Sequence, residues 1–244
     1  MSGESIEYLG SGVKVVVSES HGFGTDAVLL ADFASPKRKE KACDLGTGCG
    51  IIPMLWCRNS AAGHITAVEV QPLGCEQTEK SVEISGMSDK VTVINADLRE
   101  IKSFLPHACM DVVTMNPPYK AANSGIVSTA NSEKIARHET MCSLSDVTEA
   151  AAHLLNFGGR LCLCNRPERL SDTIFAMKQS GIEPKRLRFV VKNPQSRPWL
   201  FLIEGRKGGK PFLNVEPMLI MYKSDGELSD EVNEIYGEYK ENCK

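Results

Sequence analysis

The chain has 244 residues and a mass of 26.7 kDa, and 42% of its residues are hydrophobic, which suits one domain with a sizeable core. Its formal net charge of −3 excludes a generally basic, non-specific nucleic-acid binder, so any RNA contact must come from a local patch. The nine cysteines include no CxxC pair and no Cys-His zinc spacing, and we expect reduced thiols and no metal site. Without a targeting segment or a bilayer-length apolar run, a cytoplasmic protein that avoids membranes is expected.

The N-terminal part predicts a small hairpin followed by a helix. Residues 8–20 alternate around two glycines, which indicates a hairpin that caps one end of the domain. An apolar helix is expected over residues 27–34, with Thr25 or Asp26 as its cap. The preceding loop, residues 21–26, contains two glycines, and its entry into a helix is a place where free N–H groups can receive a ligand carboxylate. A plain capped helix is the alternative.

A glycine-rich loop then joins a short strand to a helix. Residues 42–50 read ACDLGTGCG, and the apolar residues 51–59 continue as the helix. Glycines permit tight backbone geometry and let the chain touch a ligand without side-chain obstruction. Asp44 precedes the first glycine by two residues, and the spacing is GxGxG rather than GxGxxG. On its own, this glycine cluster is also compatible with a fold that binds a nicotinamide dinucleotide.

Two further strands are predicted to end in acidic residues. Residues 64–70 form a strand that ends near Glu69, 25 positions after Asp44, which suits a carboxylate on two ribose hydroxyls. Residues 91–98 form the next strand, with Asp97 near its end. A single acid at a strand end is usually a surface residue, but a series of them favours one ligand site at the carboxyl edge of a sheet.

The stretch 110–119, MDVVTMNPPY, contains a fourth predicted strand, which ends at a stiff loop. Its β-branched run predicts a buried parallel strand, and the two prolines stop it because they lack N–H donors and fix φ. Asn116 is held extended because it precedes a proline. The loop therefore lies where open α/β sheets bind ligands. An ordinary Pro-Pro turn with a surface tyrosine is the alternative.

Residues 116–119, NPPY, resemble the motif of S-adenosylmethionine-dependent methyltransferases that act on amino or amide nitrogens. The resemblance implies that the Asn116 side-chain oxygen and the Pro117 carbonyl each accept one hydrogen of the target NH₂, and that Tyr119 stacks on the base. Likewise DLGTGCG resembles the first motif of class I methyltransferases, in which the loop and Asp44 hold the methionine moiety. In that family the residue equivalent to Asp97 accepts from the adenine amine of the cofactor.

The remaining elements are predicted by periodicity and by glycine and proline stops. A substrate loop is expected over residues 120–143, which lack periodicity. Helices are expected over 72–86, 143–156 with a stop at Gly158 and Gly159, 168–181 and 230–239. Strands are expected over 160–165, 185–191, 199–204 and, as an addition, 212–220.

Several segments together resemble the bacterial family that methylates N6 of adenine 37 in valine tRNA. They are FGTDAVLLADF, DLGTGCG, NPPY, ARHE, and KNPQSRPWL with IEGRKGG, and the match runs along nearly the full chain. The resemblance implies an α/β, Rossmann-like, doubly wound fold of seven strands, mostly parallel with an antiparallel last strand, and helices on both faces. We expect one domain, 1–244, comprising an N-terminal hairpin and helix (1–35), the substrate loop (120–143) and a C-terminal extension (211–244).

The expected site residues fall into three groups, with S-adenosyl-L-methionine as cofactor and the anticodon loop of a tRNA as partner. The catalytic group is Asn116, Pro117, Pro118 and Tyr119. The cofactor group is Phe23, Thr25, Asp26, Asp44, Gly46, Thr47, Gly48, Gly50, Glu69, Val70, Asp97, Leu98 and Asn116. Residues 185–210 carry eight basic residues and one acid, a candidate surface for phosphates unless it is a solvated edge hairpin. The RNA group is Arg137, Lys185, Arg186, Arg188, Lys192 and Arg197.

Three other functions share some of these sequence features. A glutamine-N5 methyltransferase acting on a release factor would present the same NH₂ geometry, but it carries a helical recognition domain ahead of the cofactor loop, for which Asp44 leaves no room. A non-catalytic RNA-binding protein on the same fold is disfavoured by the intact acids and motif, and GxGxG disfavours an oxidoreductase. His138 as a general base is less favoured, because an amine can lose its proton to solvent after transfer. The choice of RNA and the oligomeric state stay open, with a monomer favoured.

Overall fold

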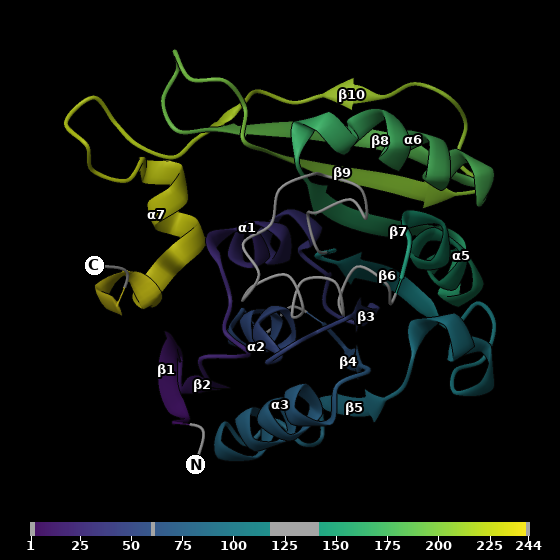
Figure 1. Cartoon of the computed structure of the whole chain (residues 1–244), viewed down its shortest axis with the longest axis horizontal. Helices are drawn as coiled ribbons and strands as arrows, with labels where there is room; N and C mark the ends of the chain where they lie inside the picture. Colours follow the sequence, from purple (N-terminus) through teal and green to yellow (C-terminus); the bar gives the residue numbers. More distant parts are fainter. Residues whose placement is uncertain (1–2, 60–61, 118–141, 243–244) are drawn as a thin grey trace, which may run out of the picture.

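The computed structural model describes residues 3–59, 62–117 and 142–242. At its centre the described chain forms a nine-stranded sheet in the order β10-β8-β9-β7-β6-β3-β4-β5, with β11 paired to β8. Figure 1 shows the strands stacked from β10 and β8 at the top to β5 at the bottom. All but the last two residues of the predicted substrate loop, 120–143, lie outside the described residues.

Seven long strands make up most of this sheet, as expected. They are β3 (Lys41–Leu45), β4 (His64–Glu69), β5 (Val91–Asn95), β6 (Met110–Met115), β7 (Leu155–Asn165), β8 (Ile182–Val191) and β9 (Leu200–Lys207). β9 runs antiparallel to both β7 and β8, whereas the other pairings in this sheet are parallel, so the antiparallel last strand is confirmed. The additional strand expected over residues 212–220 is two short ones, β10 (Asn214–Val215) and β11 (Leu219–Ile220).

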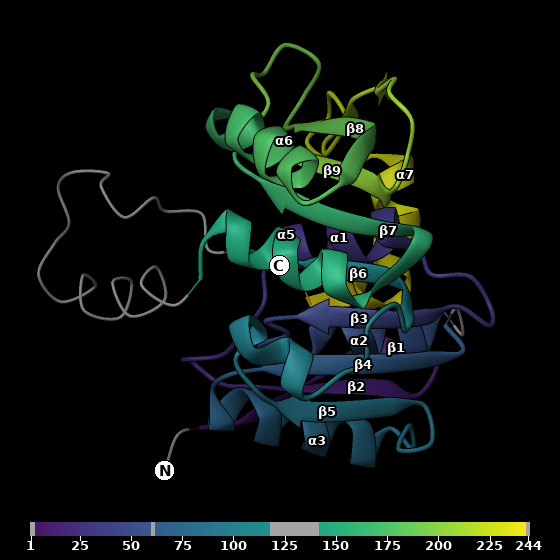
Figure 2. The same ribbon diagram turned by 90° about the vertical axis from the view of Figure 1, so that its right-hand side faces the viewer.

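Helices cover both faces of the sheet, which makes the fold doubly wound (Figure 2). One face carries α1 (Thr25–Ala34), α2 (Ile51–Arg58) and α3 (Pro72–Ile84), whose apolar side chains form one buried cluster. The other face carries the 3₁₀ segment η1 (Leu98–Ser103), α5 (Leu144–Leu154) and α6 (Leu170–Gln179), preceded by η2 (Pro167–Arg169), and encloses a second cluster. None of the described helices is both long and apolar enough to cross a lipid bilayer.

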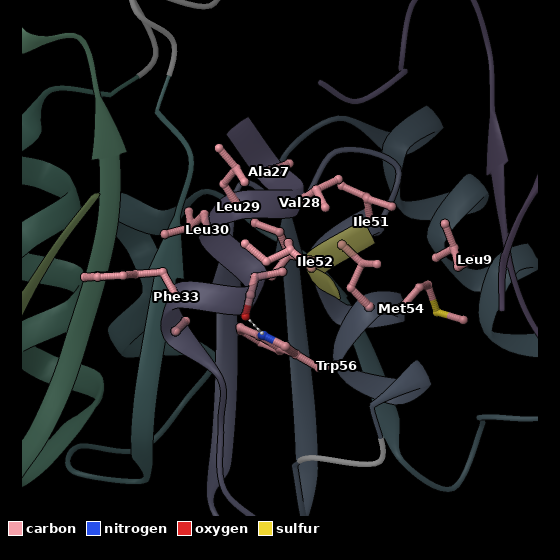
Figure 3. Packing of buried hydrophobic residues seen from close by; sticks show 14 of the residues in the cluster. Leu9, Ala27, Val28, Leu29, Leu30, Phe33, Ile51, Ile52, Met54 and Trp56 are labelled. Atoms are coloured by element: carbon pink, nitrogen blue, oxygen red, sulfur yellow. Dashed lines mark hydrogen bonds between the residues drawn. The ribbon is translucent and has the colours of Figure 1, made fainter. Parts of the chain in front are cut away.

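Helix α1 is buried on nearly all sides, which explains why its sequence is almost uniformly apolar. It packs against β6, β7 and β9 of the sheet and against α2 and α7 (Asp230–Tyr236), and its Leu30 is fully buried (Figure 3). The Trp56 indole N–H, from α2, donates to the Ala31 carbonyl of α1 at 3.0 Å. This bond satisfies the one polar atom of the largest buried side chain and fixes the spacing of the two helices.

The N-terminal hairpin is a separate two-stranded sheet of β1 (Ser5–Gly10) and β2 (Val13–Val17). It begins and ends a few residues before the predicted range, because its turn uses the left-handed residues 10–12. β2 lies on α3, where the Ser81 and Ser85 hydroxyls accept from the Val16 and Lys14 amides at 2.8 and 2.9 Å. The hairpin therefore extends the helical layer rather than the central sheet.

Two predicted helix ends are wrong. α1 is capped by Gly24 without a side-chain bond, so Thr25 and Asp26 lie inside its first turn rather than at its cap. α5 begins where predicted, with Ser143 as its N-cap in a reciprocal capping box with Asp146, but it ends at Leu154 and β7 follows at once. The glycine pair at 158–159 lies within β7, where the register against β6 shifts, so these glycines make a strand irregularity and no helix stop.

The C-terminal part packs back onto the first helical layer. The predicted helix over 230–239 is divided into α7 (Asp230–Tyr236) and η3 (Gly237–Asn242), because Gly237 takes a positive φ of 57°. The Arg58 guanidinium donates to the carbonyls of Leu9, Ile235 and Tyr236 at 2.8 to 3.3 Å. α2, the hairpin and the C-terminal helix are thus tied at one point.

Candidate active site

The glycine-rich loop between β3 and α2 is held from both sides. Gly46, Gly48 and Gly50 have φ values of 64°, 59° and 82°, a region that side chains other than glycine rarely adopt. The Gly48 amide donates to Glu69 Oε2 at 2.9 Å, and its carbonyl accepts from the Thr78 hydroxyl at 3.2 Å. The loop is therefore pre-formed by partners on β4 and α3.

Glu69 ends β4 and links two turns of the site. Its side chain is buried, and its other oxygen, Oε1, accepts from the Gln71 amide at 2.8 Å. One carboxylate thus receives N–H bonds from the glycine loop and from the turn that leads into α3. These bonds orient the side chain, which lines a cavity at the carboxyl ends of the strands.

Two cavities adjoin at the carboxyl ends of the central strands. The first, of about 270 Å³, is lined by Ser20, His21, Gly22, Gly46, Gly48, Val68, Glu69, Val70, Gln71, Ala96, Asp97, Leu98, Met115, Asn116 and Cys142. The second, of about 200 Å³, is lined by Gly22, Phe23, Gly24, Asp26, Ala27, Asp44, Gly46, Thr47, Gly48, Cys49, Ile51, Ile52 and Asn116. The two share Gly22, Gly46, Gly48 and Asn116, so together they form one trough that passes Asn116.

Asp44 gives the second cavity a buried carboxyl group. It is 1% exposed, and Thr114 of β6 donates its hydroxyl to Asp44 Oδ1 at 2.7 Å. Burial raises the pKa of Asp44 to about 7, although the Thr114 bond acts against this rise. The N-terminus of α1, at Gly24, lines the same cavity. The cavity therefore offers an acid for a cationic group and a helix N-terminus for an anionic one.

Asp97 lines the first cavity but not the second. It is the N-cap of η1, accepting from the Arg99 amide at 2.9 Å, and it is ion-paired with the Arg99 guanidinium. The bonds from Arg99 lower the pKa of Asp97. Asp97 is thus an ionised acceptor beside the apolar residues Ala96 and Leu98.

Asn116 stands where the two cavities meet. It follows β6, and its side-chain oxygen accepts from the thiol of Cys164, on the neighbouring strand β7, at 3.1 Å. Pro117 is buried behind it. Pro118 and Tyr119, the other half of the predicted catalytic group, lie outside the described residues.

Most of the expected cofactor residues line the trough. Two do not: Thr25 bonds through its hydroxyl to that of Tyr236 at 3.0 Å, and Gly50 starts α2 against Thr78. The sequence interpretation missed His21 and Gln71, which adjoin predicted positions but carry no motif of their own. In the described chain the buried Nε2 of His21 has no hydrogen-bond partner.

The structure separates the expected RNA residues. The Lys185 ammonium donates to the carbonyls of residues 210–212, Arg186 is paired with Glu204 and Glu216, and Arg188 with Glu231. Lys192 and Arg197 instead lie in the loop between β8 and β9. Arg137 lies outside the described residues.

Comparison with known proteins agrees with this geometry. The family model for the methyltransferase small domain matches residues 16–180, more than half of the chain. The chain belongs to the methyltransferase small-domain family. The matched part of this methyltransferase contains the glycine loop. It also contains every acid and amide among the described residues that line the trough, including Glu69, Asp97 and Asn116.

Relatives of the methyltransferase cover most of its length. A protein named tRNA1(Val) (adenine(37)-N6)-methyltransferase from Parabacteroides distasonis is 28% identical over 74% of this chain and 75% of its own. One of the same name from Porphyromonas gingivalis is 26% identical over 85% and 84%. The crystal structure of a predicted O-methyltransferase from Agrobacterium tumefaciens superimposes with a TM-score of 0.72 at 22% identity, covering 87% of this chain and 95% of the other, which shows the shared fold.

Proposed function

We propose that this methyltransferase uses S-adenosyl-L-methionine to methylate N6 of an adenine in tRNA, namely adenine 37 of valine tRNA, the substrate in the names of its relatives. The observation that carries the proposal is the position of Asn116 where the two cavities meet. An amide oxygen at that point can hold an amino group beside a methyl donor that occupies both cavities.

The residues present fit this cofactor. The first cavity offers Glu69 for ribose hydroxyls and Asp97 with an apolar surround for an adenine, and the second offers Asp44 and the α1 N-terminus for an amino-acid moiety. A Cβ at Gly48 would meet no atom within 4 Å, so the loop borders open space there. The buried Thr47 side chain lines the second cavity beside Asp44, and its hydroxyl lowers the pKa of that acid. When bound, the sulfonium of the cofactor supplies the methyl group.

The reaction needs the acceptor amine to be held in a reactive geometry. The lone pair of an exocyclic amine is delocalised into the ring, which makes the nitrogen a weak nucleophile. Asn116 Oδ1 and the Pro117 carbonyl would each accept one amine hydrogen and so turn the lone pair towards the donor. Because both oxygens are fixed, catalysis comes from positioning and oriented dipoles. The amine proton leaves to solvent after transfer, so no general base is required.

The RNA surface is proposed at the edge of the sheet that also bears Asn116. β7 and β9 pair with Asn165 opposite Phe201, so the loop before β9 lies at the carboxyl end of β7. That loop carries Lys192 and Arg197. We leave Lys185, Arg186 and Arg188 out of this surface, because partners within the chain already engage their charges. An anticodon-loop adenine is unpaired, so its entry into the site costs little compared with flipping from a duplex.

Incubation of the protein with total tRNA and methyl-labelled cofactor tests the proposal. After digestion to nucleosides, we expect the label in N6-methyladenosine. Label in another nucleoside, or in a release-factor protein added in parallel and not in RNA, would refute the assignment. A titration with unlabelled cofactor in the absence of RNA confirms that the protein used can bind the donor.

A further inference from the structure

The mechanism depends on which end of the Asn116 amide faces the acceptor. The oxygen and nitrogen of an asparagine side chain are nearly the same size, so the two flipped orientations pack almost equally well. Only one of them presents an acceptor to the amine. A group that distinguishes the two ends must therefore contact the amide on its other side.

Cys164 lies where it can distinguish the oxygen of the Asn116 amide from its nitrogen. Thr114 of β6 is in register with Asp44 of β3 on one side and with Cys162 of β7 on the other. Side chains alternate along a strand, so two positions further Asn116 and Cys164 occupy the same face. Cys164 is fully buried, and its Sγ lies 3.1 Å from Asn116 Oδ1.

We infer that Cys164 is a positioning residue that holds the Asn116 oxygen in its catalytic orientation; this inference rests on the proposed function. A thiol is a weak donor and an even weaker acceptor, so it favours the amide oxygen over the amide nitrogen as its neighbour. An amide oxygen has two lone pairs. The oxygen can therefore accept the Cys164 S–H, as it does in the structure, and also a hydrogen of the target amine when that amine binds.

Cys162 provides a matched control. It lies on the same strand and the same face, is also fully buried, and packs in the same apolar cluster as Cys164. Its partner in register is Thr114 rather than Asn116. Cys162→Ala therefore removes an equal volume from the same core without touching the amide.

Single-turnover methyl transfer with saturating cofactor and RNA tests the inference. Cys164→Ala should lower the transfer rate by about three- to tenfold, the scale of one modest hydrogen bond, with cofactor Kd and RNA KM within about twofold of wild type. Cys164→Ser keeps a donor and should restore most of the rate, while Cys162→Ala should leave it unchanged. Equal losses in Cys164→Ala and Cys162→Ala, or no recovery with serine, would overturn the inference.

A second readout does not depend on the acceptor. The side-chain amide NMR signals of Asn116, assigned by their disappearance in Asn116→Ala, should shift or broaden in Cys164→Ala but not in Cys162→Ala. Unchanged signals in Cys164→Ala would contradict the positioning role. Failure of the wild-type protein to form N6-methyladenosine would instead refute the proposed function and leave this measurement valid.

Discussion

Glu69 and Asp44 are buried carboxyl groups that line the trough, and they differ in their hydrogen bonds and in their burial. Glu69 accepts two backbone N–H bonds and so holds the glycine loop as well as lining the first cavity. Asp44 accepts from the Thr114 hydroxyl and is buried more completely, and this burial raises its pKa to about 7. Asn116, which lines both cavities, carries no charge, and in the proposed mechanism it acts through the direction of its dipole.

Replacement of Asn116 tests the proposed chemistry at a single side chain. Asn116→Ala should lose about 10²–10³ in transfer rate, the scale reported for one oriented hydrogen-bonding group, while cofactor affinity is retained. Single-turnover kinetics with preloaded cofactor measures the first quantity and calorimetric titration the second. A variant that transfers methyl groups at the wild-type rate would remove Asn116 from the mechanism.

Asp44 should make the stability of the ligand-free protein depend on pH. Its folded-state pKa, about 7, is above the ordinary value of 3.8, so the native state binds a proton that the unfolded chain releases. The stability from this group is complete below 3.8 and is lost as pH rises to about 7, with a slope of up to about 1.4 kcal/mol per pH unit. Urea unfolding across this range should show the fall in wild type and not in Asp44→Asn. Parallel curves for the two proteins would contradict the raised pKa.

At the scale of elements, the sequence predicted what local patterns determine. The start of α5 is fixed by a capping box between residues three apart, and β6 is a mostly apolar, β-branched run, so this helix start and this strand were predicted correctly. The wrong helix end at Gly158 has a non-local cause, because pairing with β6 draws residues 155–165 into a strand. Where α1 is capped depends on the glycine loop before it, which no side-chain preference reveals.

For the candidate active site too, the sequence predicted what local patterns determine and missed what depends on distant contacts. Asp44 and Glu69 lie in the last residues of their strands, and Asp97 and Asn116 lie just after theirs. The carboxyl ends of parallel strands meet at one edge of a sheet, so the convergence of these residues could be predicted. The ion pair between Arg188 and Glu231 joins residues 43 positions apart, and the sequence alone could not predict it. Charge alone made the basic stretch look like an RNA surface, and only the fold shows which of its charges are already engaged.

Helix α3 supports the glycine loop through a glycine of its own. A Cβ at Gly74 would lie 2.8 Å from the Gly48 carbonyl oxygen and 2.9 Å from Glu69 Cγ. Glycine to alanine inside a helix usually stabilises it by about 1 kcal/mol, but here the added methyl must displace the loop. Gly74→Ala should therefore weaken cofactor binding at least about tenfold. Glu79→Ala, an exposed change on the same helix, is the control. Equal cofactor Kd values for the two variants would contradict the supporting role of Gly74.

The loop between β8 and β9 should contribute phosphate contacts. Lys192→Glu and Arg197→Glu should each weaken tRNA binding and lower the magnitude of the slope of log K against log salt concentration by about one. Arg38→Glu makes the same charge change just before β3, at the opposite edge of the sheet, and should leave the slope unaltered. Filter binding over a series of salt concentrations measures all three. If Arg38→Glu lowers the slope as much as the loop variants, the RNA surface is elsewhere.

The whole molecule brings distant parts of the chain to one trough. The sheet order places β3 between β4 and β6, so the residues that follow these three strands are neighbours although up to 70 positions separate them. The C-terminal segment reaches the same region, because the Tyr239 ring lies 5.6 Å from that of Phe23, which lines the second cavity. One wall of the trough is thus supported by the last helical segment of the described chain.

Methylation of a defined valine tRNA transcript tests the central claim most directly. The protein is incubated with cofactor and with two transcripts that differ only in carrying adenine or guanine at position 37, and nuclease fragments are analysed by mass spectrometry. We predict one added methyl group in the fragment that contains adenine 37, recovered as N6-methyladenosine, and none in the guanine transcript. A methyl group in any other fragment, or equal methylation of both transcripts, would contradict it.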